Sequence, residues 1–140
     1  MSQSWIDQAE RDLEVAHHLA AHAFHEWACF TAQQSAEKAI KAVRLSLGTP
    51  IETIKKHEMS ELLAQIPALH PRPDPRLTKA DLLDAHVQRA RYPGYRGQGP
   101  DAPSRTYRAV DSAGAIVIAE AVLAFCKPLH AQIQTFWTTL

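Results

Sequence analysis

Residues 26–47 read EWACFTAQQSAEKAIKAVRLSL, a run without glycine or proline. Alanine, glutamate, lysine and glutamine dominate it, and these residue types lose little free energy on becoming helical. An apolar stripe recurs in it at steps of three and four residues: Cys29, Ala32, Ala36, Ile40, Val43 and Leu47. A neighbouring stripe starts with Trp27 and Phe30 and becomes polar at Gln34. The stretch therefore predicts a long amphipathic helix at the centre of a helical domain.

The sequence around this helix predicts further helices. Ser4 is expected to cap a first helix, whose apolar positions are Ile6, Ala9, Leu13, Ala16, Ala20 and Ala23. A turn is expected at His25-Glu26, and Gly48 is expected to end the central helix in a left-handed conformation. We expect a short third helix over 56–66 and a fourth that starts at Pro75, buries Leu77, Ala80, Leu83, Val87 and Ala90, and ends at Tyr92.

The C-terminal third predicts a loop and a last helix. Residues 93–106 hold three of the five glycines and are expected to be the longest structureless stretch. One face of the last helix reads Tyr107, Val110, Gly114, Val117, Ala121 and Ala124, and Gly114 is expected to permit a close helix crossing. Pro128 is expected to kink or end this helix. The pattern predicts an all-α, up-and-down bundle of four to five helices, a single domain over 1–140 with 129–140 as a C-terminal extension.

Length and charge narrow the class of protein. The 140 residues carry 15 basic and 15 acidic side chains, and this balance argues against a protein that mainly coats nucleic acid. The first residues are too charged for a signal peptide, and no uninterrupted apolar run reaches the ~18 residues of a membrane span. Cys29 and Cys126 have apolar neighbours, which predicts two buried free thiols. We expect a cytoplasmic protein without a membrane partner.

Two kinds of reactive site are weighed and not favoured. His18, His22 and His25 follow each other at four- and three-residue steps, as metal ligands do, but a structural zinc site needs four ligands. A polar, histidine-rich helix face explains them better, so we predict no metal site. Cys29 lies among apolar neighbours, and a reactive thiolate needs an accessible, electropositive setting. No motif for a cofactor is present, and we predict none.

Arginines gather around the predicted loop. They are interleaved with tyrosines in the order Arg89, Arg91, Tyr92, Tyr95, Arg96, Arg105, Tyr107 and Arg108. Guanidinium groups and aromatic faces together suit phosphate and base recognition. Lys38 and Lys41 add two ammonium groups on the polar stripe of the central helix, although Glu37 and Lys41 also fit a plain surface ion pair. Two interpretations stay open, a nucleotide or RNA site and a solvated loop beside a packing tyrosine.

Four blocks of the sequence resemble one known family. They are Trp5…Ala9-Glu-Arg-Asp-Leu13, then Trp27 to Lys41, then Lys56-His57-Glu-Met-Ser-Glu-Leu-Leu, and Ala90-Arg91-Tyr92-Pro93. In this order and spacing they resemble the HEPN domain (higher eukaryotes and prokaryotes nucleotide-binding), from Trp5 to about Phe125. The resemblance implies a helical bundle that forms homodimers. It also implies a minimal nucleotidyltransferase as partner, in a module of the toxin–antitoxin type.

The same resemblance implies a possible activity. Many HEPN proteins are metal-independent ribonucleases, marked by an arginine followed after four to six residues by a histidine. No histidine occupies that window after Arg91, so Arg91 is the best catalytic candidate, with His57 or His86 as the histidine from elsewhere. The candidate nucleotide- or phosphate-binding residues are Lys38, Lys41, Arg91, Tyr92 and Arg96. Three hypotheses follow: a nucleotide or RNA binder that acts with the nucleotidyltransferase, a ribonuclease with a rearranged site, and a dimerisation module alone.

Overall fold

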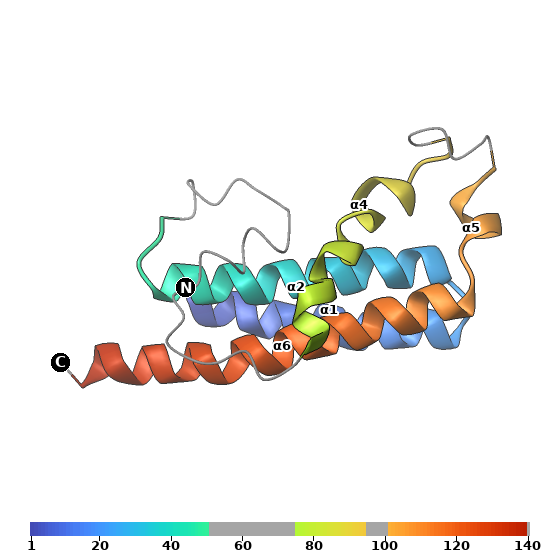
Figure 1. Cartoon of the computed structure of the whole chain (residues 1–140). Coiled ribbons are helices and arrows are strands. Elements are labelled where there is room, and N and C mark those ends of the chain that lie inside the picture. Colours follow the sequence, from blue (N-terminus) through green and yellow to red (C-terminus); the bar gives the residue numbers. More distant parts are fainter. Residues whose placement is uncertain (51–74, 95–100, 140) are drawn as a thin grey trace.

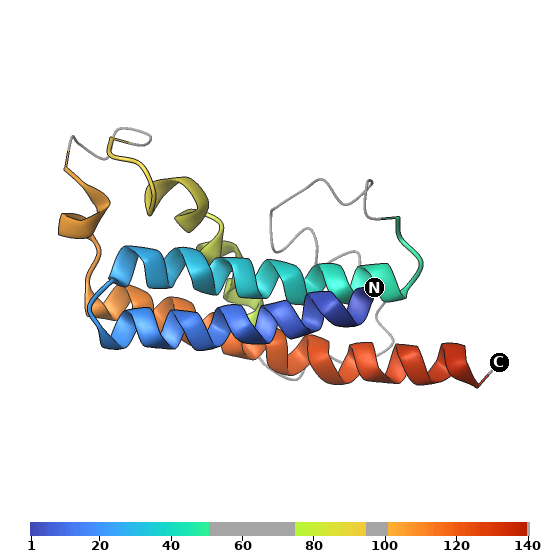
Figure 2. The same cartoon turned by 180° about the vertical axis from the view of Figure 1, so that it is seen from behind.

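The structure, a computed structural model, describes residues 1–50, 75–94 and 101–139. Three long helices lie side by side, α1 (Ser2–Ala21), α2 (His25–Ser46) and α6 (Ala109–Thr138) (Figure 1). The view from behind shows that α1 runs antiparallel to α2, while α6 runs in the direction of α2 (Figure 2). Within the described ranges there are helices and no strands, which confirms the all-α bundle.

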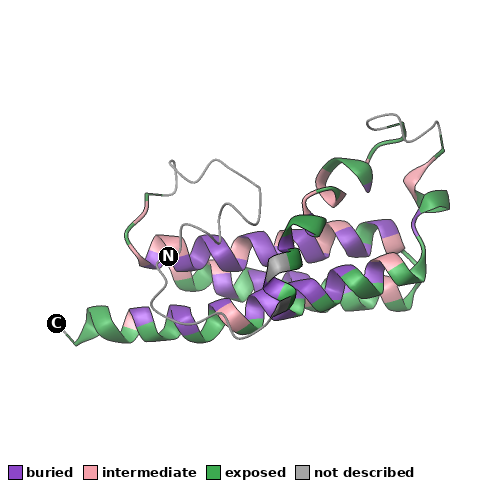
Figure 3. Ribbon diagram, viewed as in Figure 1, coloured by how far each residue is buried: buried purple, intermediate pink, exposed green. Residues whose placement is uncertain are grey.

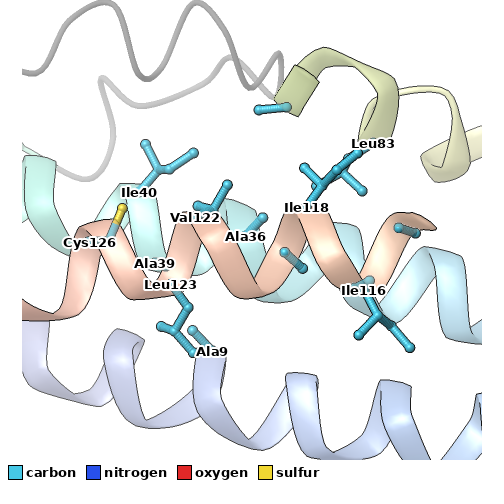
Figure 4. Packing of buried hydrophobic residues seen from close by; sticks show 14 of the residues in the cluster. Ala9, Ala36, Ala39, Ile40, Leu83, Ile116, Ile118, Val122, Leu123 and Cys126 are labelled. Carbon is cyan, nitrogen blue, oxygen red and sulfur yellow. The ribbon is translucent and has the colours of Figure 1, made fainter. Parts of the chain in front are cut away.

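The central helix is as predicted. α2 buries Cys29, Ala32, Ala36, Ile40 and Val43, and Leu47 packs at the edge of the core. Many buried positions of α1, α2 and α6 are alanines, and their small side chains let the helices approach closely. The buried faces point toward one another along the bundle (Figure 3), and larger side chains from α2, α6 and the 75–83 segment fill the space between them (Figure 4). After α2, Gly48 has φ +92, the left-handed conformation expected of it.

The ends of α1 differ from the prediction. The helix begins at Ser2 with Met1 as its N-cap, so Ser4 lies inside it and caps nothing. The turn to α2 lies over residues 22–24, ahead of the predicted His25-Glu26, and Ala23 lies in it, exposed and with φ 65. Ile6, Ala9 and Ala16 are buried as predicted, and Leu13 and Ala20 pack against the core.

The segment opposite α2 is broken where one helix was predicted. A 3-10 helix, η2 (Pro75–Leu83), is followed by a single α-helical turn, α4 (His86–Arg89). The apolar residues Leu77, Ala80 and Leu83 recur every three residues, which matches the three residues per turn of a 3-10 helix and puts all three in the core. Ala90 is also buried, and Val87 is half-buried. The helix predicted over 56–66 lies outside the described residues.

The predicted 93–106 loop contains structure. Residues Pro103–Thr106 form the short helix α5, with the proline in its first turn, where a missing N–H costs nothing. Residues 95–100 of the predicted loop lie outside the described residues. Tyr107 then turns inward and is buried at the start of α6.

The last helix corrects two predictions. α6 continues through Pro128 to Thr138, so the proline does not end it, and Leu129, His130 and Ile133 beyond it are buried in the bundle. The face that the sequence singled out is mostly exposed: Val110, Gly114, Val117 and Ala124 are exposed, whereas Tyr107 and Ala121 are buried. A Cβ on Gly114 would meet no atom within 4 Å, so this glycine makes no close crossing. α6 is apolar on nearly every side, and its periodicity alone does not single out the buried face.

The C-terminal part of α6 is bonded to the start of α1 and to the end of α2. Ser2 Oγ lies 2.9 Å from both His130 Nε2 and Gln134 Nε2, which ties the start of α1 to α6. Trp137 Nε1 donates a 2.8 Å hydrogen bond to the carbonyl oxygen of Ser46, at the end of α2. Residues beyond Pro128 are therefore a docked part of the bundle.

By length and composition alone, α6 is long and apolar enough to cross a membrane. Half of its apolar window is buried inside the bundle, against α1 and α2. Asp111 and Glu120 interrupt the apolar sequence. The packing is that of a core helix.

Candidate functional site

The predicted arginine and its tyrosine meet the aromatic residues of α2. The guanidinium of Arg91 lies over the Phe30 ring, 4.8 Å from its centroid, and 5.2 Å from the centroid of Tyr92. The rings of Trp27 and Phe30 pack edge to face, with their centroids 6.2 Å apart. Trp27 and Tyr92 are 47% and 52% exposed, so the ring beside the arginine and the ring beyond Phe30 are both open to a ligand.

The position of Arg91 is fixed and its charge is not neutralised. Its Nε donates to the carbonyl oxygen of Val87, one turn earlier, which leaves the terminal guanidinium nitrogens for other partners. No carboxylate of the described ranges pairs with Arg91, nor with Arg89, Arg105 or Arg108, whose side chains are exposed. Four guanidinium groups without a described carboxylate partner, at one end of a neutral protein, make a locally basic surface.

A small polar cavity lies beside this surface. Its volume is about 50 Å³, and its lining residues are His86, Arg89, Thr106, Tyr107 and Asp111. His86 Nδ1 lies 2.7 Å from the Tyr107 hydroxyl, and Asp111 accepts a 2.8 Å hydrogen bond from the backbone N–H of Arg108 at the start of α6. A cavity of this size holds a few waters and is too small for a nucleotide. A nucleotide would therefore lie on the surface outside it.

Burial decides the protonation states around the cavity. Burial first, and then the nearby Arg89 guanidinium, lower the pKa of His86 to about 4, against a smaller opposing effect of Asp111. Burial also raises the pKa of Tyr107, so its hydroxyl keeps its proton. Near neutral pH His86 is an uncharged imidazole bonded to an uncharged phenol. Arg91 and His86, the two catalytic candidates, share no hydrogen bond in the described part of the chain.

The His86 pKa predicts a loss of stability in mild acid. The folded-state pKa of about 4 lies below the usual value near 6.5, so between these pH values the unfolded chain binds a proton that the folded chain does not. The free energy of unfolding should therefore fall as pH falls from 6.5 toward 4. Urea unfolding at pH 7 and pH 5 measures this, and His86→Gln should reduce the difference. An unchanged difference in the variant would contradict the assignment. His130, whose pKa burial also lowers, should add to the slope in both proteins.

The two predicted lysines are not part of this surface. Lys38 forms an ion pair with Asp12 of α1, and both side chains are largely covered. Lys41 is buried and lies 3.6 Å from the Glu37 carboxylate, which is buried as well. Their charges already have carboxylate partners, so the structure does not bring these lysines together with Arg91. A hollow of about 220 Å³ lies near Lys38, with Ser4, Trp5 and Gln8, away from the arginines.

Two predicted site residues and one tyrosine of the arginine–tyrosine cluster are not among the residues that the structure describes. They are His57, Arg96 and Tyr95, which all lie beyond the described residues. The structure adds Phe30, whose ring supports Arg91, and Arg89, which lines the cavity. Arg89 belonged to the arginine cluster of the sequence. Phe30 had a signal too, since it follows Trp27 on the second stripe of α2, but nothing in the sequence paired it with an arginine about sixty residues later.

His25 and the two cysteines are held within the bundle. His25 begins α2 and lies 2.9 Å from Ser112 Oγ of α6, which separates it from His18 and His22. No three potential metal ligands gather within the described ranges. Both cysteines are buried and free, as predicted. Burial, with the carboxylates of Asp111 and Glu26, raises the pKa of the Cys29 thiol to about 12, so it is no nucleophile near neutral pH.

Comparison with known proteins places the chain. A model of the HEPN domain matches residues 2–129. The TT1696 protein of Thermus thermophilus has a similar structure, with a TM-score of 0.80 and 30% identity, over 91% of this chain and 97% of that one. The structure of ST0689, an archaeal HEPN homologue, has a TM-score of 0.71 and 33% sequence identity, over 95% of this chain and 98% of that one. An HEPN domain protein of Thermotoga maritima (tm0613) has a TM-score of 0.67 and 28% sequence identity, over 91% of this chain and 98% of that one.

No curated protein matches the chain. The family model covers most of its length, and two of the similar structures match 91% and 95% of the chain. The chain therefore belongs to the HEPN domain family.

Proposed function

We propose that this HEPN protein binds the phosphate of a nucleotide or an RNA strand on the surface formed by Arg89, Arg91, Arg105 and Arg108. The base would stack on the exposed rings of Trp27 and Tyr92. In this proposal the protein acts in the cytoplasm with a small nucleotidyltransferase, as one half of a module of the toxin–antitoxin type. Its two buried free thiols fit a reducing compartment.

The observation that carries the proposal is the setting of Arg91. Its guanidinium is fixed between a backbone carbonyl and two aromatic rings, and no described carboxylate neutralises it. Fixing an arginine costs side-chain entropy, which a purely solvated arginine would not lose. A pre-organised guanidinium beside exposed aromatic rings is the arrangement used for phosphates and unstacked bases.

Arg91→Ala is expected to weaken binding of AMP and of a short single-stranded RNA about tenfold, because one charge-assisted hydrogen bond to phosphate is lost. Arg91→Lys should keep part of the affinity, since it preserves the charge but not the planar stacking. Fluorescence anisotropy with labelled ligands measures both, and gel electrophoresis of the same samples reports RNA cleavage.

The matched control is Arg11→Ala. Arg11 is an exposed arginine of α1 that pairs with Glu14 and lies on the N-terminal half of another helix. Its removal changes the net charge by the same amount as Arg91→Ala. Equal losses of affinity in the two variants would reduce the proposal to nonspecific charge attraction and would refute a site at Arg91.

We also propose a homodimer, supported by an exposed apolar strip on α6. Val110 and Val117 are 67% and 42% exposed, and Ala113 and Gly114 lie exposed between them. An unpartnered apolar strip at helical spacing suits packing against a second helix. Val117→Asp should therefore shift the protein toward monomer in analytical ultracentrifugation. Val15→Asp, at a similarly exposed valine of α1, should not.

The nucleotidyltransferase partner rests on family membership. Its test is co-purification of the tagged chain with a minimal nucleotidyltransferase encoded in the same genome. Retention of that protein through a wash at about 0.5 M salt, where exposed charge pairs are largely screened, supports the pairing. A failure to retain it under low salt would count against the module and leave the phosphate site to be judged on its own binding data.

A further inference from the structure

The last turn of α1 carries two histidines whose rings face each other. His18 and His22 are four residues apart, both are exposed, and their ring centroids are 4.3 Å apart. Two imidazoles at this helical spacing can reach one metal ion together, as they do in helical zinc sites. The pair is separate from the arginine surface and from the cavity beside it.

A hydrogen bond sets the tautomer of one ring. His22 Nδ1 lies 2.9 Å from the carbonyl oxygen of His18. A carbonyl only accepts, so Nδ1 is the donor, and in the neutral ring Nε2 keeps its lone pair. Metal-binding histidines are commonly held in this way, with the second ring N–H donated to a carbonyl or carboxylate.

The position on the helix favours a cation. His22 is the C-cap of α1, a helix of 20 residues, and His18 lies in its last turn. The free carbonyl groups of a helix C-terminus carry a partial negative charge, which stabilises positive charge placed there. His25 begins α2, and the contact of its Nδ1 with Ser112 Oγ holds its ring against α6, so the pair is considered without it. The described residues thus offer two imidazole ligands here, and water would complete the coordination of an ion.

We propose that His18 and His22 form an open two-histidine site for an imidazole-preferring divalent cation such as Cu²⁺, Ni²⁺ or Zn²⁺. Mg²⁺ and Ca²⁺ prefer oxygen ligands and are not accommodated. The general affinity order of divalent ions puts Cu²⁺ above Ni²⁺ and Zn²⁺. The sequence did not predict this site, because only a structural zinc site with four ligands was weighed there, and the ring contact and the His22 hydrogen bond are seen only in the structure.

The test is calorimetric titration of the metal-free protein with CuCl₂ and with ZnCl₂ in a buffer that does not bind metals. One equivalent should bind, with Cu²⁺ tighter than Zn²⁺. His18→Ala and His22→Ala should each weaken binding at least tenfold, because one of two protein ligands is lost. His22→Gln, which keeps a polar side chain at the C-cap, should behave like His22→Ala.

The control is His17→Ala, on the same turn but directed to Glu120 of α6, 3.4 Å away. It should bind metal like the unmodified protein. The proposal fails if the His18 and His22 variants bind as the unmodified protein does, or if His17→Ala loses as much affinity. All three histidines are exposed, so circular dichroism is expected to find the variants folded. The result is independent of the phosphate site, since none of these residues belongs to it.

Discussion

Replacing Lys41 with methionine is expected to lower the free energy of unfolding by about 3 kcal/mol. The sequence pattern alone would assign a few tenths of a kcal/mol to the Glu37–Lys41 pair, as on an exposed helix face. In the structure both side chains are buried, with their charged groups 3.6 Å apart. Methionine fills the space but removes the ammonium from the buried pair, and breaking a buried pair costs far more than breaking a surface one.

A double-mutant cycle distinguishes a buried Glu37–Lys41 ion pair from an exposed one. Lys41→Met with Glu37→Gln removes both charges, so most of the loss should be recovered relative to Lys41→Met alone. Urea unfolding followed by circular dichroism gives the four free energies. A cost below about 0.5 kcal/mol for Lys41→Met would mean that the pair is solvated, and Lys41 would return as a candidate for phosphate binding.

Replacing Pro128 with alanine is expected to raise the free energy of unfolding by about 2 kcal/mol. α6 runs through Pro128, whose missing N–H leaves the carbonyl of Ala124 without its helical partner. Proline in a helix interior costs about 3 kcal/mol relative to alanine, and about 0.4–1 kcal/mol of this is offset because proline restricts the unfolded chain. Pro128 is exposed, so its removal takes little packing away.

Gln132→Ala is the matched control, an exposed position one turn further along α6. It should change the free energy of unfolding by less than about 0.5 kcal/mol. If Pro128→Ala gives no gain, the strain of the proline must already be relieved in the folded helix. A loss would mean that the proline ring makes a contact the helix depends on.

Local signals predicted α2 well and α6 poorly. In α2, strong helix formers, a strict apolar stripe and a following glycine all agree, and each acts within a few residues. In α6 the apolar side chains surround the helix, so its contacts with α1 and α2, far away in the sequence, select the buried face. The 77–80–83 spacing fits both an α-helix and a 3-10 helix, and packing against α2 and α6 decides between them.

The residue types of the candidate site could be read from the sequence, but the contacts of its individual residues could not. The sequence has five arginines within twenty residues, and the structure brings Arg91 of this set together with Tyr92. The sequence did not show that Lys38 pairs with Asp12 of α1, a contact over 26 residues of sequence. Phe30 was missed for the same reason, since a ring on α2 acquires an arginine only once the chain has folded back.

The most direct test of the phosphate surface uses the three tryptophans, each at a different place. Trp27 belongs to the arginine surface, Trp5 borders the hollow near Lys38, and Trp137 bonds to Ser46 at the far end. Indole N–H signals of ¹⁵N-labelled protein would be recorded by NMR during titration with AMP and with a short single-stranded RNA. The account predicts a saturable shift of the Trp27 signal, with Trp5 and Trp137 unchanged. A shift of Trp5 without Trp27, or bound ligand with no shift of Trp27, would contradict it.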